Sequence, residues 1–256
     1  MKMTAGLLKK AILGLFQHAK QKAWFLPCAQ AALQQPATPC VILISGRGSN
    51  LQAIVHEVVA GRLPLDIRAV ISNRPEASGL DLAHRAGLVT QVLDHTQFTD
   101  REAYDAALLT LIDSYQPQLV ILAGFMRILT ARFVRHYRGR LLNIHPSLLP
   151  YFPGLDTHRR ALAAGAVEHG ASVHFVTEAV DGGPVILQAR VKVLPHDNAE
   201  TLAARVLAEE HRIYPQALRW FAEKRLCLEQ RGGRDCAVLD GEPLEISEHL
   251  PLSDVE

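Results

Sequence analysis

Residues 40–50 read CVILISGRGSN, an apolar run followed by two glycines and four polar side chains. A continuous apolar run is typical of a strand that is buried on both faces of a sheet. Gly46 and Gly48 allow the chain to turn sharply after that strand. Ser49 or Asn50 can then begin a helix, whose first N–H groups are free to bind an anion. The stretch predicts either a cradle for one phosphate or a tight turn that binds nothing.

The same residues exclude two familiar nucleotide-binding loops. A dinucleotide-binding loop has a third glycine where this chain has Leu51, and an acid at the end of the second strand, where Asn73 and Arg74 stand. A P-loop has Gly-Lys followed by Ser or Thr, and that motif is absent. The glycine loop is therefore suited to a single phosphate.

The alternation of apolar runs and helical patterns continues as far as residue 145. Strands are predicted over 67–72, 89–94, 119–123 and 141–145, and helices over 50–60, 79–86, 100–115 and 130–137. Alternating units of this kind build a parallel sheet with right-handed crossovers. Such sheets bind ligands at the carboxyl ends of their strands, where the loops converge.

The pattern changes after a Pro-rich loop that follows residue 145. The predicted elements are a short helix over 157–164, β segments over 171–177 and 185–193, and a long helix over 198–224. Gly182-Gly183-Pro184 lies between the two β segments, which indicates a hairpin. We expect an α/β fold with a largely parallel central sheet, helices on both faces, and a C-terminal β-hairpin plus long helix.

Composition excludes several classes of protein. Hydrophobic residues make up 48% of the 256 residues and charged residues 21%, which excludes a disordered, collagenous or coiled-coil chain. The longest apolar stretch, Leu119–Met126, has eight residues. A helix needs about 20 apolar residues to span a membrane, so we expect no membrane span.

Charge and cysteine content bear on partners and location. The formal net charge is +1, so the chain lacks the basic composition of most nucleic-acid-binding proteins. The four cysteines form no Cys-x-x-Cys pair, and the chain is too long to need disulfides for a stable core. We predict reduced thiols, a cytoplasmic location and no nucleic-acid partner.

The two ends of the chain differ in charge from its centre. Residues 1–39 hold five Lys and no acid, with apolar residues at helical spacing, and predict a basic amphipathic extension. Residues 229–256 hold eight acids against two Arg and predict a solvated tail. We therefore divide the chain into an N-terminal extension over 1–39, a folded domain over 40–227 and an acidic tail over 228–256.

Asn143 and His145 lie two residues apart at the end of a predicted strand, so their side chains point to the same side of the sheet. An amide can stabilise a developing oxyanion, and an imidazole can exchange protons at neutral pH. The pair therefore fits an acyl-transfer site. The alternative is a capped strand end with a buried, hydrogen-bonded histidine.

Asp181 is a third ionisable group, at the glycine-rich turn between the two β segments. An Asp in such a turn often only caps it. Ser172 and His174 share one face of the preceding strand, so His174 can face the same cleft or pair with a neighbour. A zinc site built from Asp181 and the histidines, including His158, lacks a short ligand pair such as His-Glu-x-x-His, and we expect no metal.

Five segments together resemble the phosphoribosylglycinamide formyltransferase family, whose members use a folate in purine biosynthesis. The segments are 46–50 (GRGSN), 122–129 (LAGFMRIL), 143–150 (NIHPSLLP), 172–175 (SVHF) and 181–184 (DGGP). The resemblance covers residues 40–227. It implies a single-domain formyltransferase fold and transfer of a formyl group from 10-formyltetrahydrofolate, as co-substrate, to the amine of glycinamide ribonucleotide.

The resemblance also assigns roles to residues. The implied catalytic set is Asn143, His145 and Asp181, with Ser172 and His174 beside it. Asn143 and protonated His145 would stabilise the formyl oxygen during attack by the amine. Asp181 would stabilise the imidazolium and help to move the proton.

The implied ligand-binding residues fall into two groups. The residues for phosphate and ribose are Gly48, Ser49, Asn50 and Glu210. The residues for the folate are Arg101, Met126, Arg127, Ile128 and Leu129. Of the second group, Met126 to Leu129 resemble the wall of a pterin site, and Arg101 resembles a residue near the folate tail.

Two residues depart from the family pattern. Arg47 occupies the variable place in the glycine loop, where the family typically has a smaller polar residue, and it either attracts the phosphate or points to solvent. Asp156 stands where some members carry His. The extension over 1–39 is not part of the usual family core.

Three other functions are compatible with parts of the pattern. A methionyl-tRNA formyltransferase should have an added C-terminal nucleic-acid-binding domain, and a formyltetrahydrofolate hydrolase should have an N-terminal regulatory domain. A non-catalytic anion-binding α/β module would keep the glycine loop but has no reason to bring Asn143, His145 and Asp181 together. We expect small-molecule substrates and a monomer or homodimer.

Overall fold

A computed structural model describes residues 36–244 and 249–250. These residues belong to one compact unit, Pro36–Glu256. Residues 1–35, which are most of the predicted basic extension, lie outside the described residues, as do 245–248 and 251–256 of the predicted tail.

Two further sequence predictions, the absence of a membrane span and the reduced thiols, concern the described residues as a whole. None of their helices is both long and apolar enough to cross a membrane. Their cysteines, Cys40, Cys227 and Cys236, are free thiols.

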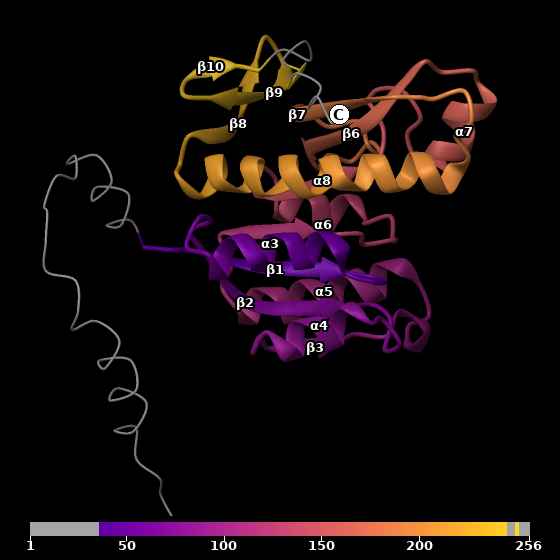
Figure 1. Cartoon of the computed structure of the whole chain (residues 1–256). Helices are drawn as coiled ribbons and strands as arrows, with labels where there is room; N and C mark the ends of the chain where they lie inside the picture. The colour runs from indigo at the N-terminus through magenta and orange to yellow at the C-terminus, as the bar shows by residue number, and fades with distance from the viewer. Residues whose placement is uncertain (1–35, 245–248, 251–256) are drawn as a thin grey trace, which may run out of the picture. The chain divides into compact units, whose positions relative to one another are not determined.

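An eight-stranded sheet lies at the centre of the described unit, with the strand order β11-β7-β6-β5-β4-β1-β2-β3 (Figure 1). Its strands are β1 (Thr38–Ile44), β2 (Leu65–Ser72), β3 (Thr90–Val92), β4 (Leu119–Leu122), β5 (Leu141–His145), β6 (Glu168–Phe175), β7 (Val185–Lys192) and β11 (His249–Leu250). Neighbouring strands are parallel from β3 to β5, and β6 pairs antiparallel with both β5 and β7. The predicted parallel sheet and hairpin are confirmed.

Helices cover both faces of the sheet. They are α3 (Ser49–Val59), α4 (Gly79–Arg85), α5 (Arg101–Ser114), α6 (Ala131–His136), α7 (Thr157–Ala163) and α8 (Ala199–Ala222), with a short 3₁₀ helix η1 (His95–Gln97). On β1, Ile42 and Ile44 belong to a core with side chains of α3 and α8, whereas Val41 and Leu43 belong to a second core with side chains of α5 and α6. All four are fully buried, which explains the continuous apolar run.

The long predicted helix is α8, which is capped at its start and hydrogen-bonded to the strands through Tyr214. Asn198 caps its first turn, where the side-chain oxygen accepts two backbone N–H groups at 2.9 Å each. The Tyr214 hydroxyl lies 3.0 Å from the carbonyl oxygens of Leu122, the last residue of β4, and Leu142 in β5. Glu210, one turn before Tyr214, is thereby held near the carboxyl edge of the sheet.

The prediction of a solvated tail beginning at residue 228 is wrong for its first part. A second, antiparallel sheet is formed by β8 (Leu226–Arg231), β9 (Arg234–Leu239) and β10 (Glu242–Pro243). Val238 is fully buried, and Asp240 forms an ion pair with Arg225 at 2.7 Å. Because several of the acids are paired and the buried residues are few, composition alone did not reveal these strands.

Candidate active site

The carboxyl ends of β1, β2 and β4 are joined through Ser45. Its N–H donates to the Gly124 carbonyl at 3.0 Å, and its hydroxyl accepts the Met126 N–H at 2.8 Å. The same hydroxyl donates to Asn73 Oδ1, just beyond β2. The chain leaves β1 toward β2 on one side and returns as β4 on the other, and open α/β sheets bind ligands at such a point.

The glycine loop forms the predicted strand-to-helix turn at this edge. Gly48 has a φ of 77°, and a Cβ there would lie 2.8 Å from the Cα of Gly79, so only glycine fits without a shift. No side chain caps α3, and its first turn closes with the Gln52 N–H donating to the Gly48 carbonyl. The first N–H groups of α3 are therefore available to an anion.

This loop opens into a cleft of about 920 Å³. Arg74, His158 and Glu210 also line the cleft. Glu210 is 8% exposed, and its Oε2 accepts a hydrogen bond from Asn50 Nδ2 at 2.6 Å. Burial raises the pKa of the Glu210 carboxyl, although the bond from Asn50 opposes this. The cleft thus combines an anion-binding end with a group that can bond to hydroxyls.

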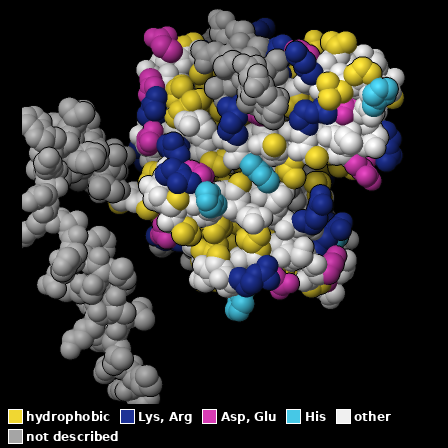
Figure 2. All heavy atoms as spheres, in the orientation of Figure 1, with side chains coloured by type: hydrophobic (Ala, Val, Ile, Leu, Met, Phe, Trp, Pro, Cys, Tyr) yellow, Lys and Arg dark blue, Asp and Glu magenta, His cyan; other side chains and the backbone are white. Residues whose placement is uncertain are grey.

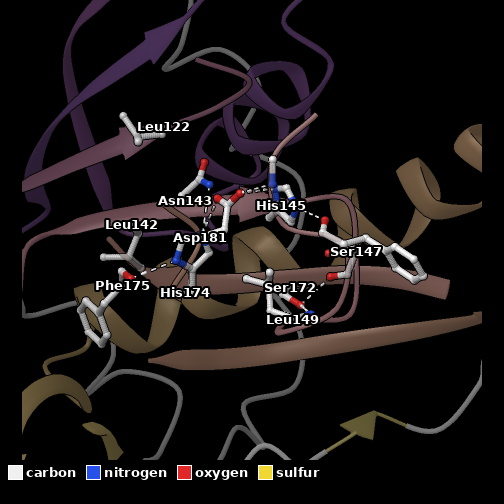
Figure 3. A network of polar contacts seen from close by, with 12 residues as sticks. Leu122, Leu142, Asn143, His145, Ser147, Leu149, Ser172, His174, Phe175 and Asp181 are labelled. Atoms are coloured by element: carbon white, nitrogen blue, oxygen red, sulfur yellow. Dashed lines mark hydrogen bonds and ion pairs between the residues drawn. The ribbon is translucent and has the colours of Figure 1, made fainter. Parts of the chain in front are cut away.

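The pairing of β5 with β6 places Asn143 opposite His174 (Figure 3). Asn143 Nδ2 lies 3.1 Å from His174 Nε2, and His174 Nδ1 lies 2.9 Å from the Phe175 carbonyl. Nδ1 therefore carries the proton, and Nε2 accepts from the amide. Burial lowers the pKa of His174, which favours this neutral form. The second N–H of the Asn143 amide is left for a ligand.

Asp181 lies between His145 and His174 (Figure 3). Its Oδ2 is 3.4 Å from His145 Nδ1, and its Oδ1 is 3.7 Å from His174 Nε2. The same Oδ2 accepts the Gly154 N–H at 2.8 Å. On the other side of its ring, His145 Nε2 lies 3.0 Å from the Phe152 carbonyl oxygen. Because both nitrogens of His145 face acceptors, the doubly protonated ring is the form that can donate to both.

A smaller cavity of about 110 Å³ borders these groups. Its lining includes Asn143, His174 and Asp181 together with the apolar side chains Ile128 and Leu129. An apolar ligand in this cavity would therefore present its end to an amide and a carboxylate. The described residues contain no group of three or more His, Cys, Asp or Glu side chains that could hold a metal ion.

Residues 39–218 match the formyl transferase family. The chain belongs to the formyl transferase family. The phosphoribosylglycinamide formyltransferase of Escherichia coli K12 is 53% identical over 204 residues, which are 80% of this chain and 94% of that protein. The Haemophilus influenzae protein of the same name is 43% identical over 203 residues, or 79% and 94% of the two chains.

Solved structures of formyl transferases show the same fold. The phosphoribosylglycinamide formyltransferase of Coxiella burnetii, in complex with CHES, superposes with a TM-score of 0.78 at 51% identity. The match covers 83% of this chain and 98% of that one. The predicted family and the formyltransferase fold are confirmed, and the chain is a group-transferring enzyme.

Ser172 supports the segment that follows β5 in this formyl transferase. Its fully buried hydroxyl donates to the Ser147 carbonyl at 2.6 Å and accepts the Leu149 N–H at 3.0 Å. Gln188 on β7 donates to the same hydroxyl at 2.8 Å. These bonds fix the chain just after His145.

The residues predicted to bind the folate do not all lie together. Residues 127–129 line the smaller cavity, whereas Met126 lines the cleft. Arg101 lines neither of these two, and its guanidinium lies 3.9 Å from Glu102 at the start of α5. The folate role of Arg101 stays a prediction that the geometry of the site does not by itself support.

Sequence reasoning missed two features of the formyl transferase site. The loop over residues 152–154 reaches His145 and Asp181 through a carbonyl and an N–H, which no side-chain pattern reveals. The rings of His158 and His169 pack edge to face with centroids 5.1 Å apart, next to this loop. The Pro-Gly pair at 153–154 was the available signal, because it marks a turn after the catalytic strand.

His169 should make the formyl transferase fold sensitive to acid. The side chain is 1% exposed, and burial lowers its pKa from 6.5 to about 4. The native state then binds this proton more weakly than the unfolded chain, so the free energy of unfolding falls as the pH drops from 6.5 to 4. This group contributes a loss of up to about 3 kcal/mol in that window.

Urea unfolding at several pH values measures this loss. The His169→Gln variant, which cannot be protonated at that position, should lose less stability than the wild type between pH 6.5 and 4. Parallel declines for the two proteins would show that His169 is not the group responsible.

Proposed function

We propose that the chain transfers the formyl group of 10-formyltetrahydrofolate to the amine of glycinamide ribonucleotide in purine biosynthesis. The observation that carries the proposal is the convergence of Asn143, His145 and Asp181. Asn143 and Asp181 line the smaller cavity, and residues 144 and 146, on either side of His145, line the cleft. The trio thus stands between two places where two substrates can bind.

The cleft suits the nucleotide. Its phosphate binds the N–H groups of Ser49 and Asn50 at the start of α3. Its ribose hydroxyls bind Glu210, which the Asn50 amide holds in place. The glycinamide end then points along the cleft toward residues 144–146.

The smaller cavity suits the folate. Its apolar lining at Ile128 and Leu129 packs against the flat pterin ring. The formyl group, carried by the nitrogen that links the pterin to the rest of the folate, then lies beside Asn143. The amine and the formyl carbon meet there, and holding both ligands side by side can supply up to about 7 to 11 kcal/mol of barrier lowering.

The reaction is a direct transfer. The amine nitrogen attacks the formyl carbon, a new C–N bond forms, and negative charge develops on the formyl oxygen. The free N–H of Asn143 and the doubly protonated ring of His145 stabilise this charge. The bond from carbon to the folate nitrogen then breaks, and one proton passes from the attacking to the departing nitrogen. Asp181 stabilises the imidazolium and relays the proton through water.

A small amine is a better acceptor for this site than a transfer RNA. On the face shown in Figure 2, Lys and Arg side chains are interspersed with acidic, neutral and apolar ones. A transfer RNA is bound through a continuous basic surface. A non-catalytic anion-binding module, for its part, does not account for the trio next to the second cavity.

An absorbance assay of folate deformylation tests the proposed function. Purified protein is mixed with 10-formyltetrahydrofolate in the presence and in the absence of glycinamide ribonucleotide. The proposal predicts turnover only when the nucleotide is present. Equal turnover without it would identify a hydrolase instead, and no turnover in either mixture would refute the transfer reaction.

Arg47 should contribute to nucleotide affinity. Arg47 and Arg74 line the cleft, and neither forms an ion pair with a carboxylate of residues 36–244. Removing an exposed charge that faces a phosphate costs at most about 1 kcal/mol, so Arg47→Ser should raise the KM for the nucleotide about fivefold at low salt. The kcat should not change, because Arg47 forms no hydrogen bond or ion pair with the trio.

Steady-state kinetics at low and high salt check this expectation. Arg85→Ser, on α4 and outside the cleft, removes the same charge and should leave the KM unchanged. The effect of Arg47→Ser should shrink as salt screens the charge. A KM that does not respond to Arg47→Ser at low salt would mean that this guanidinium only points to solvent.

A further inference from the structure

We propose that Arg160 is a positioning residue that holds His145 and Asp181 in their reactive arrangement by fixing the loop over residues 152–155, the "152–155 loop". This inference rests on the proposed function, because it assigns Arg160 a part in the same reaction. Arg160 lies on α7, outside both cavities. It acts through the loop rather than on a substrate.

The 152–155 loop contacts both ionisable members of the trio with backbone atoms. The Phe152 carbonyl oxygen lies 3.0 Å from His145 Nε2, and the Gly154 N–H donates to Asp181 Oδ2 at 2.8 Å. The two contacting residues are separated by Pro153 alone. A small shift of the loop would therefore disturb the histidine and the carboxylate together.

The loop conformation needs support from outside. Phe152 has a φ angle of 53°, in the left-handed region that non-glycine residues rarely adopt. The neighbouring side chains give little apolar packing, because Tyr151 is 69% exposed and Leu155 is 74% exposed. Burial of apolar surface thus does not suffice to hold the loop.

Arg160 supplies this support through its guanidinium. Its Nη1 donates to the Pro153 carbonyl and, at 3.3 Å, to the Leu155 carbonyl, which stand on either side of Gly154. Its guanidinium carbon lies 5.8 Å from the centroid of the Phe152 ring. The planar, multiply donating guanidinium can make all of these contacts at once, whereas the ammonium of a lysine cannot.

Kinetics should separate positioning from binding. Because the cleft itself stays intact, Arg160→Gln should lower kcat about tenfold while the KM for the nucleotide changes less than about twofold, as expected when reacting groups are slightly misplaced. Added guanidinium ion should restore part of the kcat of Arg160→Ala, and ammonium ion should not. Arg160→Lys should recover little, although it keeps the charge.

Arg159→Gln is the matched control. Arg159 is the neighbouring exposed arginine on the same helix, and no hydrogen bond or ion pair of its side chain is seen in the described part of the chain. It loses the same charge and should keep the wild-type kcat. An equal loss of kcat in Arg159→Gln, or a wild-type kcat in Arg160→Gln, would overturn the proposal.

A magnetic resonance measurement tests the inference without any substrate. In ¹⁵N-labelled wild type and Arg159→Gln, the Nε2–H proton of His145 should give the signal of a hydrogen-bonded ring N–H. In Arg160→Gln and Arg160→Lys the signal should broaden or shift toward that of a solvated ring, and guanidinium ion should bring it back in Arg160→Ala. A signal that is unchanged in a folded Arg160 variant would refute the positioning role. Lack of turnover in the wild type would refute the proposed function alone, because the His145 signal is measured without substrate and does not depend on turnover.

Discussion

Replacing Asn143 by Ala should lower kcat by about 10²- to 10³-fold, the usual effect of removing one oxyanion donor. The His174 ring fixes the Asn143 amide, so that one N–H is available to the formyl oxygen in the transition state. The alanine variant loses this donor without losing the phosphate cradle. The KM for the nucleotide should therefore stay near the wild-type value.

Steady-state kinetics of the deformylation assay measure this effect. Gln97→Ala serves as the control and should behave as wild type. It removes an exposed amide in η1 that lines neither cavity. A kcat for Asn143→Ala within about threefold of the wild type would exclude the role of an oxyanion donor, which is worth much more than that.

His145→Ala should have an effect of similar or larger size. Loss of proton transfer and of a positive charge next to the reacting oxygen should lower kcat by about 10²- to 10⁴-fold. The variant also leaves the Asp181 carboxylate without its partner at 3.4 Å, so the remaining charge in the site becomes more negative. That charge opposes the negative charge that develops on the formyl oxygen.

The His145 variant is compared with His84→Ala on α4, which removes a histidine outside both cavities. Only His145→Ala should lose activity. If His145→Ala retained substantial turnover, the charge on the formyl oxygen would have to be stabilised by another group, and His145 would not belong to the catalytic set.

Much of the fold could be predicted because its strands are either fully buried or bounded by turns rich in glycine and proline. The run at residues 40–44 is apolar throughout, since successive side chains of β1 face two different cores. Gly182-Gly183-Pro184 marked the β6–β7 hairpin for a local reason: a Cβ at Gly183 would lie 1.8 Å from the Phe175 carbonyl oxygen. Signals of this kind are local, so a single sequence suffices to read them.

The second sheet was missed because its acidic residues outweighed the one local signal, the Gly232-Gly233 pair that joins β8 to β9. β8 and β9 are mixed in polarity, and the acids in them pair with arginines from elsewhere, such as Asp235 with Arg138. Partners that lie 97 residues apart in the sequence cannot be matched from composition. The excess of acidic residues in this segment therefore predicted a solvated tail.

The candidate site was predictable in its side chains but not in its backbone. Asn143 and His145 could be placed on one side of a strand from their spacing, and the fold confirms their position at the carboxyl edge. The register that sets His174 against Asn143, and the carbonyl of Phe152 at His145, depend on tertiary structure. The role of Arg160 could not be predicted for the same reason, because its partners are backbone carbonyl oxygens.

A crystal structure of the protein with glycinamide ribonucleotide and an unreactive analogue of the formyl folate would test the central claim most directly. The amide nitrogen of Asn143 should lie about 3 Å from the oxygen that stands for the formyl oxygen, as an oxyanion donor does, and the His145 ring should lie beside the same oxygen. The phosphate should bind at the start of α3. Electron density that places the two ligands far from each other, or the formyl group away from Asn143, would contradict the proposed reaction and its catalytic residues.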